Sequence, residues 1–243
     1  MSKKSVSKAK TPERTSPVVI GGLVVIAALV VLVLIQVGRS DNPAVVATVP
    51  APTGIETGST EDGHYYRGSL TAKVVVVEYE DLRCPYCQQY FLETEPQVLE
   101  QYVRTGLVRE ESHLIAILGS PSISAAEAAY CAGEQGKYWE FRHVAFTNQP
   151  PETTPDGRAN FVKYAGQVGV DVSKFTNCFD TERYQSKVNQ TTQQAQQVGV
   201  ESTPTLFVNG VKYQGAIPFL PNANFSHGFK DVLDAALIVA GGG

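Results

Sequence analysis

The feature that most constrains the fold is a run of four valines followed closely by two cysteines. Residues 74–77 form an unbroken β-branched run, which is typical of a strand buried on both faces. Cys84-Pro85-Tyr86-Cys87 follows this run, and proline is well tolerated in the first turn of a helix. The sequence therefore predicts a buried strand that leads into a helix, with the cysteine motif at the junction.

Such a junction makes a cysteine reactive. At a helix N-terminus Cys84 faces unpaired backbone N–H groups and the positive end of the helix dipole, so its pKa should fall below that of a free thiol. The thiolate is the attacking species in disulfide exchange. Cys87 lies one helical turn further along the same face. We expect Cys84 to be the exposed nucleophile and Cys87 to be the shielded thiol that resolves the exchange.

Two other interpretations of these cysteines stay open at this point. One is a zinc site that combines the motif with Cys131 and Cys178, although those two are not a closely spaced second pair. The other is a purely structural disulfide between Cys84 and Cys87. All four cysteines lie beyond residue 80, and their even number is compatible with full pairing in an oxidising compartment.

The elements that follow the motif predict an α/β chain. The helix that begins at Cys84 is expected to reach Arg104, with a kink or interruption at Pro96. A second strand is predicted over residues 107–117. A last helix is predicted over residues 227–240.

Helical patterns and one hairpin fill the remaining interval. Asn209-Gly210 lies between two short apolar runs and is a strong hairpin signal. The helical segments are 122–135, 137–147, 157–168, 171–179 and 181–198. The predicted architecture is a sheet with a helical insertion at about 120–198.

The N-terminal part has a different character. Residues 1–17 form a basic tail, and residues 18–37 are apolar apart from Gln36. About twenty helical residues span a hydrocarbon core, and the preceding positive charges place the N-terminus in the cytoplasm. We therefore predict a transmembrane helix at 18–37, a flexible linker at 38–63 and an extracytoplasmic domain at 64–243. A cleaved signal peptide is the alternative, and it places the domain in the same compartment.

Charge and motif content exclude several function classes. Five of the 20 basic residues lie in the first fourteen positions, so the remainder carries 15 basic and 23 acidic side chains. A body with this balance is a poor candidate for nucleic-acid binding. The four histidines show no metal-ligand spacing, and the sequence has no phosphate-binding or dinucleotide motif. We predict no metal and no organic cofactor.

A second motif completes a resemblance to a known family. Ser202-Thr203-Pro204-Thr205 lies about 120 residues after the cysteine motif, and a cis bond before Pro204 would make a tight turn there. Together with the segment that begins Cys131-Ala-Gly-Glu, residues 66–240 resemble the DsbA-like branch of the thioredoxin superfamily. The resemblance implies a thioredoxin fold with a helical insertion. It also implies a substrate chain that pairs with the backbone at Thr203 and Pro204 and contacts Pro85 and Tyr86.

The resemblance also implies roles for residues outside the motifs. Glu78 corresponds to a buried acid that moves protons to and from the resolving cysteine, and burial would raise its pKa. A carboxylate at an exposed strand end is the alternative. Glu80 and Asp81 are expected to be solvated. Relatives carry a structural disulfide in the insertion, which implies a Cys131–Cys178 bond; two buried free thiols are the alternative.

The function expected from this resemblance is thiol–disulfide exchange outside the cytoplasm. The chain would donate disulfides to unfolded or reduced secreted and cell-envelope proteins, and a membrane thiol oxidase linked to quinone would reoxidise it. A reductase or isomerase is one alternative, because Pro85-Tyr86 departs from the Pro-His of the best-known oxidase. A non-catalytic adaptor or chaperone on the same fold is another.

Overall fold

The computed structural model describes residues 54–151, 154 and 157–241. All of them belong to one compact unit of the chain, Pro50–Gly243. The predicted basic tail, the predicted transmembrane helix at 18–37 and most of the predicted linker lie outside the described residues. Within the described ranges, the helices are too short or too polar to cross a membrane.

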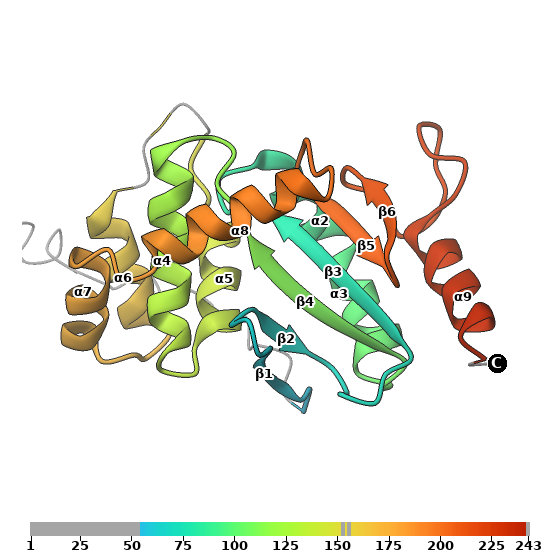
Figure 1. Cartoon of the computed structure of the whole chain (residues 1–243), viewed down its shortest axis with the longest axis horizontal. Helices are drawn as coiled ribbons and strands as arrows, with labels where there is room; N and C mark the ends of the chain where they lie inside the picture. The colour runs from blue at the N-terminus through green and yellow to red at the C-terminus, as the bar shows by residue number, and fades with distance from the viewer. Residues whose placement is uncertain (1–53, 152–153, 155–156, 242–243) are drawn as a thin grey trace, which may run out of the picture. The chain divides into compact units, whose positions relative to one another are not determined.

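A six-stranded mixed sheet forms the centre of the unit (Figure 1). Its spatial order is β1-β2-β4-β3-β5-β6; β3 and β4 are parallel and the other neighbours antiparallel. The strands are β1 Thr57–Ser59, β2 Tyr65–Arg67, β3 Val74–Glu80, β4 Val108–Leu114, β5 Thr205–Val208 and β6 Val211–Gln214. The valine run therefore begins the central strand β3, as the sequence predicts.

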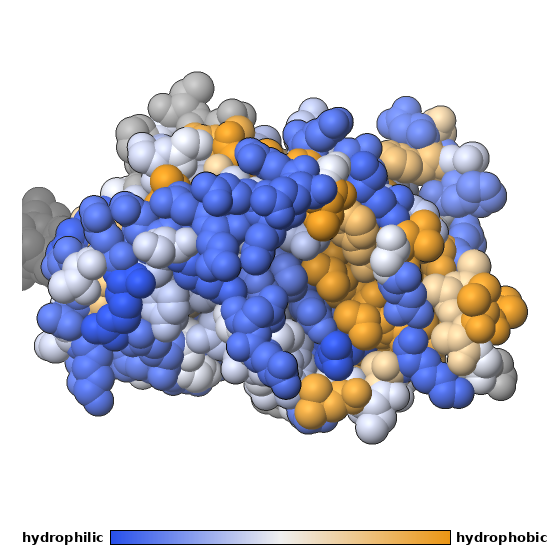
Figure 2. All heavy atoms as spheres, in the orientation of Figure 1, coloured by the Kyte–Doolittle hydropathy of each residue, from blue (hydrophilic) through white to orange (hydrophobic). Residues whose placement is uncertain are grey.

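The two faces of β3 are not buried equally. Val74 and Val76 are 0% and 1% exposed, whereas Val75 and Val77 are only partly buried. The prediction of a strand buried on both faces is thus only half right. Figure 2 shows the reason: apolar side chains remain visible over β3 and β5, between α8 (Gln185–Gln197) and β6. One helix covers only part of this face.

Helices cover the other face of the sheet more completely. The chain that follows the cysteine motif forms α2 (Pro85–Glu93), α3 (Glu95–Val98) and the π-helical segment η1 (Leu99–Val103). The predicted single helix is interrupted at Thr94, two residues before Pro96, because proline fits the first turn of α3 but not a helix interior. With α9 (Phe229–Val239), these helices bury Val74, Val76, Leu206 and Val208.

The helical insertion has a core of its own. It contains α4 (Ser120–Gly133), α5 (Tyr138–Thr147), α6 (Arg158–Gln167), α7 (Val172–Asp180) and α8, close to the predicted bounds. Cys131 of α4 and Cys178 of α7 are joined by a disulfide. Figure 1 shows these helices at one end of the sheet, with α8 returning across its front. The insertion core includes Phe141, Phe161 and Phe175, and it also contains Cys84 and Cys87.

The strands β1 and β2 correct the predicted boundary at residue 63. Residues 57–59 fall in the predicted flexible linker, yet they form β1, which pairs with β2. Three-residue strands leave no hydrophobic period in the sequence, so the pattern could not reveal them. Gly58 is required by a close approach, since a side chain there would meet the hydroxyl of Tyr66.

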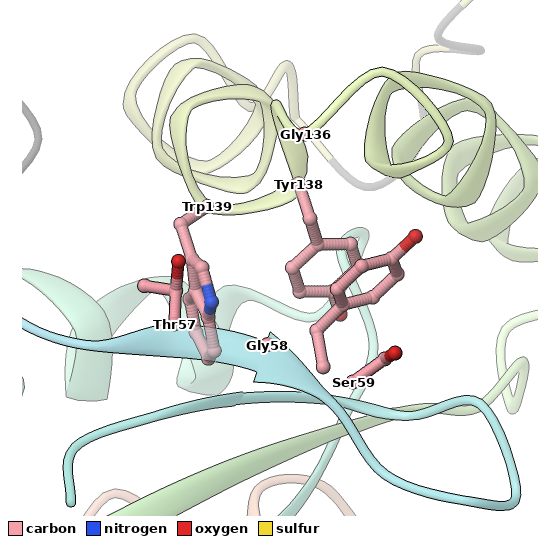
Figure 3. A pocket seen from close by; sticks show the side chains of 7 residues that line it. Thr57, Gly58, Ser59, Gly136, Tyr138 and Trp139 are labelled. Carbon is pink, nitrogen blue, oxygen red and sulfur yellow. The ribbon is translucent and has the colours of Figure 1, made fainter.

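A cavity of about 200 Å³ lies beside this hairpin (Figure 3). The rings of Tyr65, Tyr138 and Trp139 line it, with the backbone of β1 as one wall. None of the predicted site residues contributes to this cavity. The cavity is therefore separate from the cysteine motif.

Candidate active site

The cysteine motif caps helix α2 in the manner that the sequence predicts. Cys84 is the N-cap residue, with extended backbone angles (φ −78°, ψ 123°), and Pro85 is in the first turn. Both thiols are free. Cys87 is fully buried, and Cys84 is 5% exposed, so the expected nucleophile shows only a small part of its surface. Tyr86 between them is 63% exposed.

The surroundings of Cys84 favour its thiolate. A hydrogen bond from the Cys87 thiol is the largest cause that lowers the pKa of Cys84, to about 6. The Thr203 side chain and the backbone N–H groups of Cys87 and Tyr86 act in the same direction, whereas burial opposes them. These amides are the unpaired donors of the helix N-terminus, and they add to the larger effect of the Cys87 thiol in favouring a Cys84 thiolate.

The surroundings of Cys87 have the opposite effect. Burial is the main cause that raises the pKa of Cys87 well above the ordinary thiol value. The hydrogen bond and the charge interaction with Cys84 raise this pKa further, and the Asp81 N–H, 3.5 Å from the Cys87 sulfur, lowers it. The charge of Glu80 raises it by less than any of these. Two thiols one turn apart are thus held in different protonation states.

The Thr203–Pro204 loop lies against the motif. Its peptide bond is cis, as the sequence predicts, and the Cys84 thiol donates to the Thr203 carbonyl oxygen at 3.3 Å. The Thr203 hydroxyl is buried and has no hydrogen-bond partner among the described residues while Cys84 is a thiol. It can donate to the thiolate when Cys84 ionises. Thr205 pairs with Tyr79 of β3, which brings the loop to the end of the strand that precedes the motif.

Asp81 fixes the loop that leads into Cys84. Its carboxylate accepts from the backbone N–H groups of Arg83 at 2.8 Å, Ile117 at 3.0 Å and Leu118 at 3.3 Å. Asp81 is fully buried, so the prediction that it is solvated is wrong. Three backbone donors replace the water that a free carboxylate would bind. Asp81 is a positioning residue for the motif.

Side-chain contacts also tie this loop to the helical insertion. Arg83 is 2% exposed, and its guanidinium donates to the carbonyls of Pro151 at 3.2 Å and Thr154 at 2.5 Å. Gln149 donates to the carbonyls of Leu82 at 2.8 Å and Cys84 at 3.1 Å. The segment after α5 therefore holds the backbone around Cys84 in place.

A network of buried charges lies behind the motif. Its members are four carboxylates and two guanidinium groups: Glu78, Glu80, Glu95, Glu110, Arg67 and Arg142. Arg142 of α5 reaches the carboxylates of β3, and Arg67 of β2 pairs with Glu110 at 2.9 Å. Glu80 is 0% exposed, so the prediction that it is solvated is also wrong. Each of these carboxylates contacts at least one of the two guanidinium groups, which offsets part of the cost of burying charge.

Glu78 is fully buried, in agreement with the position that the sequence gives it. One of its oxygens lies 3.3 Å from Arg142, and the other has no hydrogen-bond partner in the part of the chain that the structure describes. Burial and the neighbouring charge of Glu80 raise the pKa of Glu78. Its role in proton transfer to and from Cys87 stays a prediction.

Among the described residues, the cysteines and the buried acids are poorly suited to hold a metal ion. Oxygens of Glu78, Glu95 and Glu110 lie within 4.8 Å of one another, but Arg67 and Arg142 contact the same carboxylates and oppose a cation there. The disulfide between α4 and α7 removes the second cysteine pair that a four-cysteine zinc site would require.

Four buried residues that hold the site were not among the predicted site residues: Glu80, Asp81, Arg83 and Arg142. Glu80 carried a signal, because alternate residues of a strand face the same side and Glu78 was already predicted to be buried. Arg142 carried none, since it lies 62 residues from Glu80 in the chain.

Comparison with known proteins agrees with this geometry. The model of the family described as Thioredoxin matches residues 59–220. The probable disulfide bond formation protein D of Bacillus cereus is 29% identical over 149 residues, which are 59% of this chain and 68% of the relative. The Na(+)/H(+) antiporter NhaA 3 of Salinispora tropica is 34% identical over 162 residues. These are 63% of this chain and 23% of the antiporter, so the chain spans about a quarter of that relative's length.

Solved structures give the same result. BdbD from Bacillus subtilis superposes with a TM-score of 0.62 at 21% identity and covers 71% of this chain and 92% of its own. The disulfide bond oxidoreductase DsbG from Mycobacterium tuberculosis superposes with a TM-score of 0.55 at 28% identity, and the match covers 79% of this chain and 96% of DsbG. The chain belongs to the thioredoxin family, as a DsbA-like member.

Proposed function

We propose that the protein is a thiol–disulfide oxidoreductase that donates the Cys84–Cys87 disulfide to substrate proteins. The observation that carries this proposal is the asymmetry of the two thiols. The pKa of Cys84 falls to about 6 at the helix N-terminus, and burial raises the pKa of Cys87. A stabilised thiolate is a good leaving group, and it also stabilises the reduced enzyme, which favours transfer of the disulfide to the substrate.

The proposed reaction begins with the oxidised enzyme. A substrate thiolate attacks the Cys84 sulfur, the Cys84–Cys87 bond breaks, and the Cys87 sulfur leaves and takes up a proton. A second substrate thiolate then attacks the mixed disulfide and displaces Cys84 as a thiolate. The substrate loses two electrons and the enzyme disulfide gains them, so the reduced enzyme ends with a Cys84 thiolate and a Cys87 thiol.

Substrate binding in this proposal uses backbone more than side chains. Thr203 and Pro204 would pair with an extended substrate segment beside Cys84. Two apolar side chains at the site are exposed, those of Tyr86 and the 38%-exposed Ile117. They support binding of unfolded chains. Ile117 lies at the motif because its N–H donates to Asp81.

The proposed location is the outer side of a membrane. The apolar residues 18–37 with preceding basic residues support a membrane anchor, and the Cys131–Cys178 disulfide supports an oxidising compartment. A membrane thiol oxidase, linked to quinone, would reoxidise the cysteine pair. An anchor would keep the two proteins close.

The reduction potential of the Cys84–Cys87 couple tests the direction of transfer. We would equilibrate the full-length chain with glutathione buffers and trap free thiols with a mass tag. A potential more oxidising than that of glutathione is expected for a disulfide donor. A strongly reducing potential would instead make the protein a reductase and overturn the proposal.

A further inference from the structure

The inference concerns two histidines that the proposed reaction does not use, His64 and His113. His64 lies between β1 and β2, directly before Tyr65, and His113 belongs to β4. Their rings are stacked, with centroids 3.6 Å apart and an angle of 12° between the planes. His64 is 1% exposed, and the ring of Tyr79 from β3 packs edge-on against His113 at 5.0 Å. The pair therefore lies between the β1–β2 hairpin and the rest of the sheet, largely shielded from water.

Lys187 of α8 contacts this hairpin at two points. Its ammonium group donates to the backbone carbonyl of Asp62, and it lies 3.3 Å from Nε2 of His64. The turn itself is closed by backbone hydrogen bonds, from the Thr60 N–H to the His64 carbonyl at 2.8 Å and from the Gly63 N–H to the Thr60 carbonyl at 2.9 Å. Lys187 thus ties a closed turn of the hairpin to the helical insertion.

The contact with Lys187 requires a neutral His64. An ammonium group can only donate a hydrogen bond, so Nε2 of His64 must be the acceptor and Nδ1 must carry the proton. Nδ1 is buried and has no hydrogen-bond partner among the described residues. A second proton on this ring would place an N–H against the ammonium group and a positive charge against the stacked ring of His113. The charged ring would also be buried away from water.

Other charged groups face the pair from the hairpin and from β4. The Asp62 carboxylate lies 3.5 Å from Nε2 of His64, but its side chain is 67% exposed, so water and salt screen its charge. Glu111 of β4 lies 3.6 Å from His113 and is already paired with Arg109 at 2.6 Å. The two carboxylates therefore offset only part of the cost of a second proton on His64.

The balance of these groups favours the neutral ring. Burial is the main cause that lowers the pKa of His64 to about 3; the charges of His113 and Lys187 lower it further, and the two carboxylates oppose them. Against the effect of burial, hydrogen bonds lower the pKa of both carboxylates, and burial raises the pKa of Tyr79. Between pH 7 and pH 5 these three groups keep their charge, so the histidines dominate any change.

We propose that His64, His113 and Lys187 form an acid-sensitive latch, which holds the β1–β2 hairpin against α8 and releases it when His64 takes up a proton. In the released hairpin the ring of His64 is hydrated, and neither the ammonium group nor the second imidazole opposes its charge. Protonation therefore stabilises the released form relative to the latched one. The cysteine motif is not part of the latch, so this inference does not depend on the proposed function.

Hydrogen exchange of the full-length, oxidised protein at pH 7 and pH 5 tests the latch. The oxidised form is used because Cys84 titrates in the same range when it is reduced. Mass spectrometry of peptides that cover residues 57–65 gives the protection of the hairpin amides, after correction for the pH dependence of intrinsic exchange. With a His64 pKa of about 3 in the latched form and 6.5 in the released form, protection should fall about 25-fold from pH 7 to pH 5.

The β5–β6 hairpin is an internal control, because it lies at the opposite edge of the sheet and contains no histidine. Its protection should not fall over this range. His64→Gln keeps an acceptor for Lys187 but cannot take up a proton, so its β1–β2 hairpin should stay protected at pH 5. His227→Gln is the matched control, since it makes the same change in an exposed loop and should behave like the wild type.

Three outcomes would overturn the inference. One is equal protection of the wild-type β1–β2 hairpin at the two pH values. Another is an equal loss in both hairpins, which would indicate acid unfolding of the whole domain. The third is an undiminished loss in His64→Gln, which would assign the effect to another group.

If His64→Gln does not fold, His113→Gln decides. This variant removes one of the charges that oppose protonation of His64, so the loss of protection in its β1–β2 hairpin must be smaller than in the wild type. An equal or larger loss contradicts the latch. None of these results bears on the direction of disulfide transfer, which the reduction potential of the Cys84–Cys87 couple tests separately.

Discussion

The two cysteine pairs of the protein lie in the same hydrophobic core but differ in their electrostatic surroundings. Cys131 and Cys178 are joined between two helices and lie among aromatic side chains, at a sequence separation of 47. Cys84 and Cys87 are one turn apart, with the Cys87 thiol and the helix amides as donors at the Cys84 sulfur. Burial is similar in both pairs. This difference shows that hydrogen-bond donors and charges around the sulfur atoms, more than exposure, distinguish a reactive thiol pair from a structural one.

The largest effect should follow from removing the nucleophile. We expect Cys84→Ser to lower the rate of disulfide transfer to a reduced, unfolded protein by at least about 1000-fold, because no other thiolate is held at a helix N-terminus in the described residues. Rapid quench with thiol labelling measures the rate. An adaptor or chaperone would keep its activity in this variant, and that outcome would contradict the oxidoreductase assignment.

Removing the Cys131–Cys178 disulfide should lower the stability of the protein and leave its activity unchanged. The double variant Cys131→Ala/Cys178→Ala should keep its transfer rate and lose about 4 kcal/mol of stability, because the unfolded chain is no longer cross-linked over 47 residues. Urea unfolding of the oxidised proteins measures the change. A loss of transfer activity in a folded double variant would show that the two pairs are not independent.

The pH dependence of stability should distinguish the oxidised and reduced forms. The pKa of Cys84 is about 6 in the folded protein, below the ordinary thiol value of about 8.5. Stability from this thiolate is fully present above pH 8.5 and is lost as pH falls toward 6. The free energy of unfolding of the reduced form, relative to the oxidised form, should therefore rise from pH 6 to 8.5, by at most about 1.4 kcal/mol per pH unit.

Urea unfolding of both forms at several pH values measures this difference. Groups outside the motif titrate alike in the two forms and cancel. A difference that does not change with pH would mean that Cys84 is not a stabilised thiolate.

The smallest effect should come from one hydrogen bond at the motif. Thr203→Val removes the hydroxyl that can donate to the Cys84 thiolate, so the pKa of Cys84 should rise by about one unit. Thiolate absorbance near 240 nm during a pH titration reports this value. Thr203→Ser keeps the hydroxyl and is the control. If the Thr203→Val protein titrates like the wild type, the helix amides and the Cys87 thiol are enough to lower the pKa of Cys84.

The sequence was informative where local chemistry determines structure. The valine run, the proline at the start of α2 and Asn209-Gly210 each correspond to an observed strand, helix start or turn, and both turn residues have positive φ. The pairing of Cys131 with Cys178 came from the family resemblance and not from spacing.

Features that depend on distant partners could not be predicted in this way. The alternation of β3 indicates that Glu80 shares the buried face of Glu78, but the guanidinium that makes its burial favourable, that of Arg142, lies 62 residues away in the chain. Asp81 is buried for a similar reason, since its partners Ile117 and Leu118 arrive from another strand's end. The short strands β1 and β2 are held by main-chain pairing, which leaves no pattern in side-chain type.

The contacts of Arg83 and Gln149 have a consequence for the order in which the protein matures. Residues up to Thr154 must be in place before the backbone on both sides of Cys84 is held, and Thr203 must follow before its loop is complete. A chain that is synthesised from its N-terminus therefore presents Cys131 before the reactive site is assembled. The nucleophile therefore gains its full reactivity only once the segments that contain Gln149, Thr154 and Thr203 have packed around it.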